Sequence, residues 1–232
     1  MEIIITDLTR FKKRDNVCTA GVTLDGTVVR PWPYLRFDNL EKLGIHPGGI
    51  LQGEFQNLEK SAPHTEDASY GKLVFKGPAT KQAFRQALEQ TLFPGLSAGF
   101  ESELTSGEKC IPVDSPPPRS LITIRMDPKA FSIEQDSYDV SRLRAHFTDE
   151  TGMRMAYVGV TDLGFFDYAQ EHAASPADIA KLEEFIQSQD ELFLRVGLSR
   201  VHKAPDGRHG YWIQLNGIYT FPNYLEYIRC YE

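Results

Sequence analysis

Cysteine is scarce in this chain of 232 residues, which has three. Cys18, Cys110 and Cys230 lie far apart, and none of them belongs to a Cys-x-x-Cys or Cys/His pattern with the spacing of a zinc site. The number is also odd. The sequence therefore predicts no structural metal, and we expect no cofactor.

Long apolar runs are absent as well. Runs such as Ile3-Ile4-Ile5 and Leu192-Phe193-Leu194 are far shorter than the roughly 20 residues of a membrane-spanning helix. The first residues, Met1-Glu2-Ile3, are acidic and have neither the basic segment nor the cleavage site of a secretory signal. We therefore expect a cytoplasmic protein with no membrane partner. The sequence also has no P-loop and no His-Glu-x-x-His motif, which leaves the commonest nucleotide-dependent and zinc-hydrolytic chemistries without support.

The two ends of the chain resemble each other. Leu8-Thr9-Arg10-Phe11-Lys12-Lys13 is echoed by Leu198-Ser199-Arg200-Val201-His202-Lys203, and Leu24-Asp25-Gly26 is echoed by Leu215-Asn216-Gly217. Each copy has an apolar run, a charged connection and a pair of candidate strands around a glycine turn. A short repeat cannot bury its apolar face alone, so the echo predicts two copies of a β-meander in two packed barrels.

Alternating apolar residues predict a strand over Val17 to Leu24, ahead of the hairpin signal Asp25-Gly26. About five candidate strands precede residue 77, which is the strand count of an OB barrel. In the second copy, Asn216-Gly217 is expected to break the strand from Tyr211 to Phe221. The fold class is therefore mainly β with a few helices, arranged as two OB-like five-stranded barrels packed together.

Helix signals and loop composition predict the domain limits. Thr80 can cap a helix whose apolar residues recur every four positions, and this helix is expected to cover a barrel opening or the seam. Residues 94–119 are rich in Gly, Ser and Pro, which favours an extended linker. We therefore expect one barrel over residues 1–93 and a second over 120–232, the latter with a helix over 176–189 that begins after Ser175.

The net charge of −7 and the pI near 5.4 argue against a protein that coats nucleic acid through its overall field. A local basic patch is still present at Arg10, Lys12, Lys13 and Arg14, and Arg30 could join it. The alternative is a solvated connection between strands, because charge clusters are common in loops.

Aromatic residues accompany these cations, as in OB folds that stack bases on rings and hold phosphates with cations. The alternatives are that the rings fill the barrels and that Arg10 and Arg200 bond to main-chain carbonyls at barrel corners. The candidate nucleic-acid contacts are Arg10, Lys12, Lys13, Arg30, Trp32, Tyr34, Arg200, Lys203, Arg208 and Trp212.

Pro63-His64-Thr65-Glu66-Asp67 is the segment that most resembles a catalytic site. An imidazole with two carboxylates nearby can bind a divalent metal or transfer protons, and a further aspartate could complete the set. The alternative is a hydrogen-bonded turn. The candidates for completing the site are Asp7, Asp162 and Asp167.

Several segments together resemble the dual OB-domain family of bacterial proteins. The resemblance implies two OB folds and binding to nucleic acid, and it carries no enzymatic motif. The segments are Thr6-Asp7-Leu8-Thr9-Arg10, Arg30-Pro31, Pro47-Gly48, Gly53-Glu54-Phe55, Pro63 to Asp67, Arg195 to Arg200 and Gly217-Ile218-Tyr219.

Three functional hypotheses follow. The first is a non-enzymatic module that binds single-stranded or distorted nucleic acid. The second is an enzyme that acts on nucleic acid or a nucleotide through His64, Glu66 and Asp67. The third is an adaptor that binds a protein partner through sheet edges or covering helices.

Overall fold

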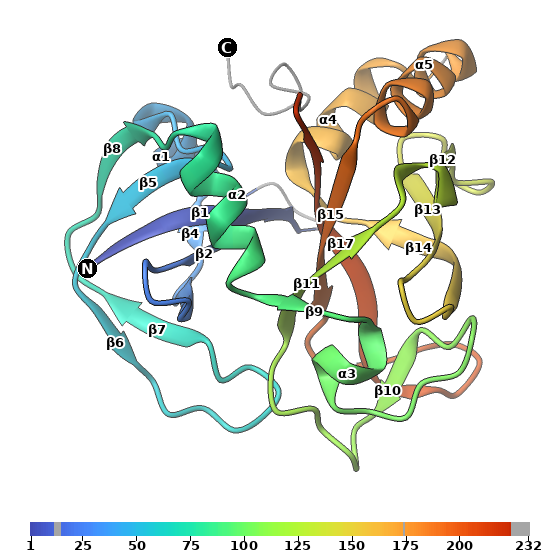
Figure 1. Cartoon of the computed structure of the whole chain (residues 1–232). Helices are drawn as coiled ribbons and strands as arrows, with labels where there is room; N and C mark the ends of the chain where they lie inside the picture. The colour runs from blue at the N-terminus through green and yellow to red at the C-terminus, as the bar shows by residue number, and fades with distance from the viewer. Residues whose placement is uncertain (12–14, 174, 224–232) are drawn as a thin grey trace.

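The computed structural model describes residues 1–11, 15–173 and 175–223, which form two β-sheets side by side with helices at their junction and edges (Figure 1). The fold is mainly β with a few helices, as the sequence predicts. The two sheets have eight and nine strands among the described residues. Each has more strands than the five expected of a barrel.

The N-terminal sheet curls into a half-barrel (Figure 1). Its order is β6-β7-β3-β2-β1-β5-β8, with β4 paired to β2, and β3 runs parallel to β7. The long central strand β1 is buried over most of its length because apolar residues lie on both of its faces. The strands are β1 (Glu2–Arg10), β2 (Asn16–Val22), β3 (Val28–Pro31), β4 (Leu35–Arg36), β5 (Gly49–Gln52), β6 (Phe55–Asn57), β7 (Asp67–Tyr70) and β8 (Val74–Pro78).

The second sheet has the order β12-β13-β14-β17-β15-β11-β9, and β10 and β16 also pair with β17. Its inner face carries the largest apolar core of the molecule. The strands are β9 (Leu92–Phe93), β10 (Cys110–Pro112), β11 (Leu121–Met126), β12 (Phe131–Gln135), β13 (Leu143–Thr148), β14 (Arg154–Val160), β15 (Glu191–Leu198), β16 (His202–Lys203) and β17 (His209–Phe221).

The helix predicted after Thr80 covers the seam between the sheets (Figure 1). Thr80 Oγ1 accepts a hydrogen bond from Ala83 N at 3.1 Å, which is the expected N-cap. Phe84 and Leu88 then pack with Ile4 of one sheet and Phe193 of the other. The helices are α1 (Phe37–Leu43), α2 (Lys81–Glu89), α3 (Leu96–Phe100), α4 (Leu163–Glu171) and α5 (Pro176–Gln187), with the 3-10 helix η1 (Pro128–Ala130).

The two glycine turns of the repeat have different fates. Gly26 has φ +86° and lies in a tight turn between β2 and β3, as predicted. Asn216-Gly217 does not interrupt the strand, so the prediction of a turn there is wrong. Strand β17 continues through it with a bulge, because Arg195 pairs with Gly217 while Val196 pairs with Leu215.

Close packing explains the second glycine. A Cβ at Gly217 would lie 2.5 Å from Tyr219 Cε2, so a side chain there would displace a buried ring. A glycine was therefore a turn signal in one copy of the repeat and a packing requirement in the other.

The segment over residues 94–119 is not an extended linker throughout. It contains α3, whose Leu96 and Phe100 are fully buried in the second core, and β10, which pairs with β17. Its composition predicted a loop because apolar anchors are few, but Leu96, Phe100 and Ile111 are buried in the second core and fix the segment there. The helix expected over 176–189 is present as α5 and ends at Gln187.

A buried ion pair joins the two sheets. Arg195 of β15 donates from Nε and Nη2 to Asp7 Oδ2 of β1, at 3.0 and 2.8 Å, and neither side chain is exposed to solvent by more than 1%. Tyr219 of β17 donates to the Thr6 carbonyl at 2.7 Å. These bonds give the sheets a fixed relative position.

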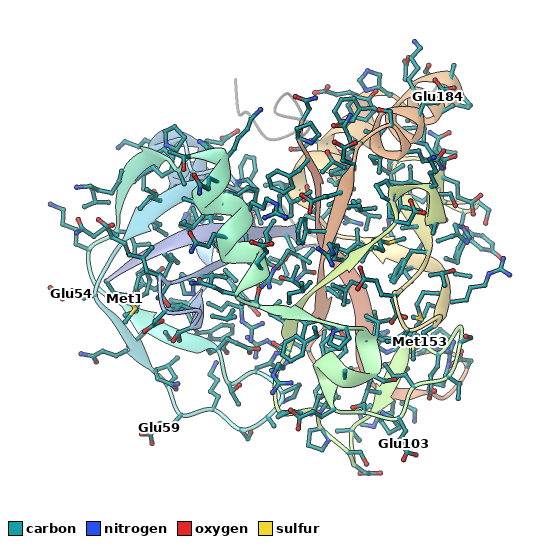
Figure 2. The ribbon with its side chains drawn as sticks, viewed as in Figure 1. Met1, Glu54, Glu59, Glu103, Met153 and Glu184 are labelled. Atoms are coloured by element: carbon teal, nitrogen blue, oxygen red, sulfur yellow. The ribbon has the colours of Figure 1, made fainter. Side chains whose placement is uncertain are left out.

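Along the described ranges, the helices are all too short or too polar to cross a bilayer. Figure 2 shows exposed acidic residues on the outer surfaces, including the labelled Glu54, Glu59, Glu103 and Glu184.

Candidate functional site

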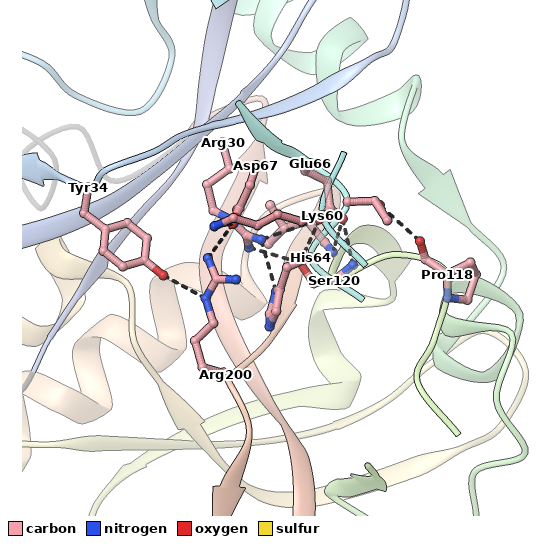
Figure 3. Close-up of polar contacts among 11 residues, drawn as sticks. Arg30, Tyr34, Lys60, His64, Glu66, Asp67, Pro118, Ser120 and Arg200 are labelled. Atoms are coloured by element: carbon pink, nitrogen blue, oxygen red, sulfur yellow. Dashed lines mark hydrogen bonds and ion pairs between the residues drawn. The ribbon is translucent and has the colours of Figure 1, made fainter. Parts of the chain in front are cut away.

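The residues of the predicted catalytic segment come together in a buried polar cluster between the two sheets (Figure 3). We call it the Arg30 cluster, and it consists of Arg30, His64, Glu66, Asp67 and Ser120. The backbone places its centre, because Arg30 of β3 is the cross-strand partner of Asp67 in β7. Arg30 Nε donates to Asp67 Oδ1 at 2.5 Å and Nη1 donates to Ser120 Oγ at 3.0 Å.

His64 is held as a neutral acceptor within this cluster. Its Nδ1 lies 3.0 Å from Arg30 Nη2, and since a guanidinium only donates, Nδ1 is the acceptor. Burial, and then the charges of Arg30 and Arg200, lower the pKa of His64 to about 3. The imidazole is therefore neutral at physiological pH, and its one free lone pair is already used.

The Nε2 atom of His64 is buried and has no partner among the described residues, whereas both carboxylates are fully engaged. Glu66 accepts hydrogen bonds from Ser120 N at 2.7 Å, Ser120 Oγ at 2.9 Å and Leu121 N at 3.1 Å, which ties its loop to the start of β11. Asp67 Oδ2 accepts from Lys60 Nζ at 2.7 Å and from Arg200 Nη2 at 2.8 Å.

Charge pairing decides the ionisation of Asp67. Burial opposes its charged form, but hydrogen bonds from Lys60, Arg200 and Arg30 outweigh burial and lower its pKa to about 2. Across the part of the chain that the structure describes, no three His, Cys, Asp or Glu side chains are grouped as metal ligands. The Arg30 cluster is built to join the sheets.

Four residues cover the cluster, and we call them the Trp32 face: Trp32, Tyr34, Lys60 and Arg200. Lys60 Nζ lies 3.7 Å from the centre of the Trp32 ring, and Arg200 Cζ lies 4.9 Å from it. Arg200 Nε donates to Tyr34 Oη at 3.0 Å (Figure 3). The Lys60 and Arg200 side chains are 32% and 37% exposed, so Trp32 orients two cations that reach solvent.

A second site is a basic pocket of about 530 Å³, which we call the Arg10 pocket. Its cations come from four places in the chain: the end of β1, the residue before β10, the residue before β13, and β13 itself. Its lining residues are Arg10, Lys109, Arg142, Leu143, Arg144, Tyr157, Gly159, Val160, Thr161, His202, Trp212, Ile213 and Gln214.

Like charges act on one another in this pocket. Burial lowers the pKa of Arg10, and the charges of Arg142 and Arg144 add to this effect, while Asp139 and Asp167 oppose it. The Arg10 guanidinium lies 3.9 Å from the centre of the Phe166 ring. Its Nε is buried and has no hydrogen-bond partner among the described residues.

Lys109 is positioned by a strained residue. Tyr157 has φ +57°, a left-handed conformation that is rare for an aromatic residue. Its carbonyl accepts a hydrogen bond from Lys109 Nζ at 3.3 Å, and its hydroxyl accepts from Ser137 N at 2.9 Å. Burial, and then the charges of Arg144 and Arg208, lower the pKa of Lys109.

The structure separates the two arginines of the sequence repeat. Arg10 lies in the pocket without an ion pair to a described carboxylate, whereas Arg200 lies in the Trp32 face and pairs with Asp67. Two aromatic rings nevertheless connect the segments that carry the two arginines. The ring of Phe11, the residue after Arg10, lies 4.6 Å from that of Tyr34, which accepts a hydrogen bond from Arg200.

The remaining predicted contacts fall into three groups. Arg30 is 3% exposed and lies beneath the Trp32 face, where it is bonded to Asp67. Trp212 lines the pocket, with Arg208 stacked 4.7 Å from its ring and paired to Asp206, while Lys203 is exposed in β16. Lys12, Lys13 and Arg14 lie outside the described residues.

The aspartates proposed to complete the His64 site have other surroundings. Asp7 pairs with Arg195, and Asp162 caps α4 by accepting a hydrogen bond from Phe165 N at 3.1 Å. Asp167 lies in α4 and acts on Arg10 through its charge.

Sequence reasoning missed Lys109, Arg142, Arg144 and Tyr157. Arg142 and Arg144 are two residues apart, directly before and within β13, and this spacing places side chains of an extended segment on one face, a signal that the sequence carries. Lys109 lay in the expected linker, and no sequence signal predicts the left-handed conformation of Tyr157.

One further motif has no catalytic surroundings. Gly95-Leu96-Ser97-Ala98-Gly99 matches the Gly-x-Ser-x-Gly pattern of serine hydrolases. Ser97 lies within α3, and its Oγ accepts a hydrogen bond from Leu104 N at 3.4 Å. The pocket beside it contains no histidine among its described lining residues, so it has no base to activate the hydroxyl.

Comparison with protein-family models and with curated proteins gives no match for this chain.

Proposed function

We propose that this chain is a non-enzymatic module of the dual OB-domain type, in which two OB-like barrels bind single-stranded nucleic acid. The observation that carries the proposal is the Arg10 pocket, where four cations and two aromatic rings line one cavity. Arg10 and Lys109 form no ion pair with a carboxylate of the described ranges. A phosphate would neutralise cations that now repel one another.

The Trp32 face extends the site beyond the pocket. The Trp32 and Tyr34 rings lie 4.5 Å apart, and Tyr34 contacts Phe11, the residue after Arg10. Lys60 and Arg200 add two partly exposed cations beside these aromatic rings. A strand that enters the pocket can therefore pass its backbone over the Trp32 face, as in other single-strand-binding grooves.

Trp212 and Tyr157 supply the stacking surfaces in this proposal. Both line the pocket, and stacking of a base on an aromatic ring is worth about 1 to 3 kcal/mol. The negative net charge is compatible with such a site because acidic side chains lie on outer surfaces, including Glu54 and Glu184 (Figure 2). We expect modest affinity and little sequence discrimination.

The test is a fluorescence-anisotropy titration with a labelled single-stranded oligonucleotide at about 50 and about 200 mM salt. Each neutralised phosphate charge contributes about −0.7 to the slope of log affinity against log salt, so the two pocket cations without a carboxylate partner in the described ranges, Arg10 and Lys109, predict a slope of about −1.4. Arg10→Gln is expected to weaken binding about tenfold and to flatten the slope.

Lys129→Gln is the matched control, because Lys129 is an exposed cation of η1 away from the pocket lining. Its binding curve is expected to overlay that of the unmodified protein. Absence of binding at the lower salt concentration would contradict the proposed function.

The enzymatic hypothesis has no support from the geometry of the Arg30 cluster. The acceptor nitrogen of His64 and both carboxylates are occupied by hydrogen bonds from within the protein. The adaptor hypothesis stays a prediction.

A further inference from the structure

The cations of the Arg10 pocket differ in how their charge is balanced. Arg142 Nε lies 2.8 Å from Asp139 Oδ2, and Arg144 is hydrogen-bonded to Asp136. Arg10 and Lys109 have no such partner in the described ranges. Of the four lining cations, two are paired with carboxylates and two, Arg10 and Lys109, are not, although Asp167 acts on Arg10 through its charge.

Two charges match one kind of phosphate group. An internal phosphodiester carries a single negative charge, whereas a phosphomonoester carries about −1.5 to −2 at pH 7 and offers three acceptor oxygens. Arg10 lines the pocket with no partner for its Nε among the described residues, and Lys109 supplies a second cation. Donors of this number and charge favour the end of a strand.

The arrangement of the cations also favours an end. Arg10, Lys109 and Arg144 come from separate segments and converge on one cavity, whereas a groove that follows an internal backbone spaces its cations along the strand. The volume of about 530 Å³ lies in the range of small-ligand pockets. Tyr157 and Trp212 in its walls can take the base of one terminal nucleotide.

We propose that the Arg10 pocket binds the terminal phosphomonoester of a single strand, at its 5′ or its 3′ end. This inference rests on the proposed function, since it assigns an end to the nucleic acid that the module binds. The remainder of the strand then leaves the pocket over the Trp32 face.

The experiment measures the anisotropy of three oligonucleotides of one sequence, with a 5′-phosphate, a 3′-phosphate or hydroxyl groups at both ends. One phosphorylated form is expected to bind about tenfold more tightly than the hydroxyl form. The form that gains affinity identifies the end. Equal, salt-dependent binding of all three would overturn the inference and leave the proposed function intact, while absence of any binding would overturn both.

Two variants test whether the pocket causes the preference. Lys109→Met removes one of the two unbalanced charges and is expected to reduce the preference to about twofold, with weaker change for the hydroxyl form. Gly159→Leu leaves every charge in place but puts a side chain into the pocket. Even a Cβ at this position would lie 3.0 Å from Arg144 Nη1, so the rest of the leucine takes the space that a ligand would need. It is expected to abolish the preference as well.

Lys129→Met, a neutralised cation outside the pocket lining, is expected to keep the full preference. Melting curves identify any variant that does not fold, and the other pocket variant then decides. A preference that survives in a folded variant with the pocket filled would overturn the inference.

Discussion

The Arg30 cluster, together with the Trp32 face that covers it, and the Arg10 pocket each contain several cations, but the positive charges are balanced differently. Arg30 of the cluster and Lys60 and Arg200 of the Trp32 face all donate to the Asp67 carboxylate. In the Arg10 pocket two cations have no such partner in the described ranges, and burial, followed by the like charges of Arg142 and Arg144, lowers the pKa of Arg10.

Burial explains why the two sites differ. A buried charge without a partner costs several kcal/mol, so the arginine between the sheets must be paired inside the protein. A partly exposed pocket tolerates unpaired cations because water stabilises them until an anion arrives. Charge balance therefore distinguishes an arginine that holds the fold, such as Arg30, from one that can bind a ligand, such as Arg10.

The largest expected effect comes from breaking the charge balance of the Arg30 cluster. Asp67→Asn removes the nearer carboxylate of buried Arg30, leaves it only the 3.6 Å pair with Glu66, and releases Lys60 and Arg200. The free energy of unfolding is expected to fall by about 3 to 5 kcal/mol, as for other broken buried ion pairs. Urea unfolding followed by circular dichroism measures it.

Asp38→Asn is the control for this effect. Asp38 also pairs with an arginine, Arg36, but both side chains are more than 60% exposed. Exposed pairs contribute little, so no measurable loss of stability is expected. Equal effects of the two substitutions would contradict the distinction between buried and exposed pairs.

The second effect is a pH dependence of stability that His64 causes. Its pKa is about 3 in the folded protein and near 6.5 in the unfolded chain. As pH falls below 6.5 the unfolded chain binds a proton that the folded protein does not, so stability falls. Between pH 6.5 and 4 the loss attributable to His64 is about 3 kcal/mol.

His64→Gln tests this assignment, because the amide oxygen can still accept from Arg30 but does not titrate. The difference between its stability and that of the unmodified protein is expected to change with pH between 6.5 and 4, and to be constant above pH 7. Asp67, whose pKa is lowered from 3.8 to about 2 by folding, also begins to reduce stability below about pH 5, but it does so in both proteins and cancels in their difference. A difference that is independent of pH would show that another group titrates.

Much of the fold follows from local patterns in the sequence. The capped helix after Thr80, the turn at Gly26 and the helix after Ser175 depend on residues within a few positions of one another, and all three are present. The strand instead continues through Asn216-Gly217, where a break was expected. This continuity depends on the packing of Tyr219 and on the register of β17 against β15, which are tertiary properties.

The site was predictable only in part for the same reason. Arg10 and Trp212 were expected to contact a ligand, and both line one pocket. Arg30 was also expected to contact a ligand, but it is buried. Its burial depends on its cross-strand partner Asp67, which is 37 positions away, so no local pattern indicates it. Lys109 joins the pocket through pairing of β10 with β17, which its loop-like composition concealed.

The smallest expected effect comes from removing a carboxylate that offsets part of the positive charge of the Arg10 pocket. Asp139 pairs with Arg142 at 2.8 Å and also attracts Arg10, so Asp139→Asn frees one cation and raises the local positive charge. Affinity for a single-stranded oligonucleotide is expected to rise about twofold at low salt and to return to the unmodified value at high salt, where partly exposed charges are screened. Anisotropy titrations at the two salt concentrations measure this change. Weaker binding of the folded variant would mean that Asp139 orients Arg142 for the ligand, and the unpaired cations alone would then not explain the site.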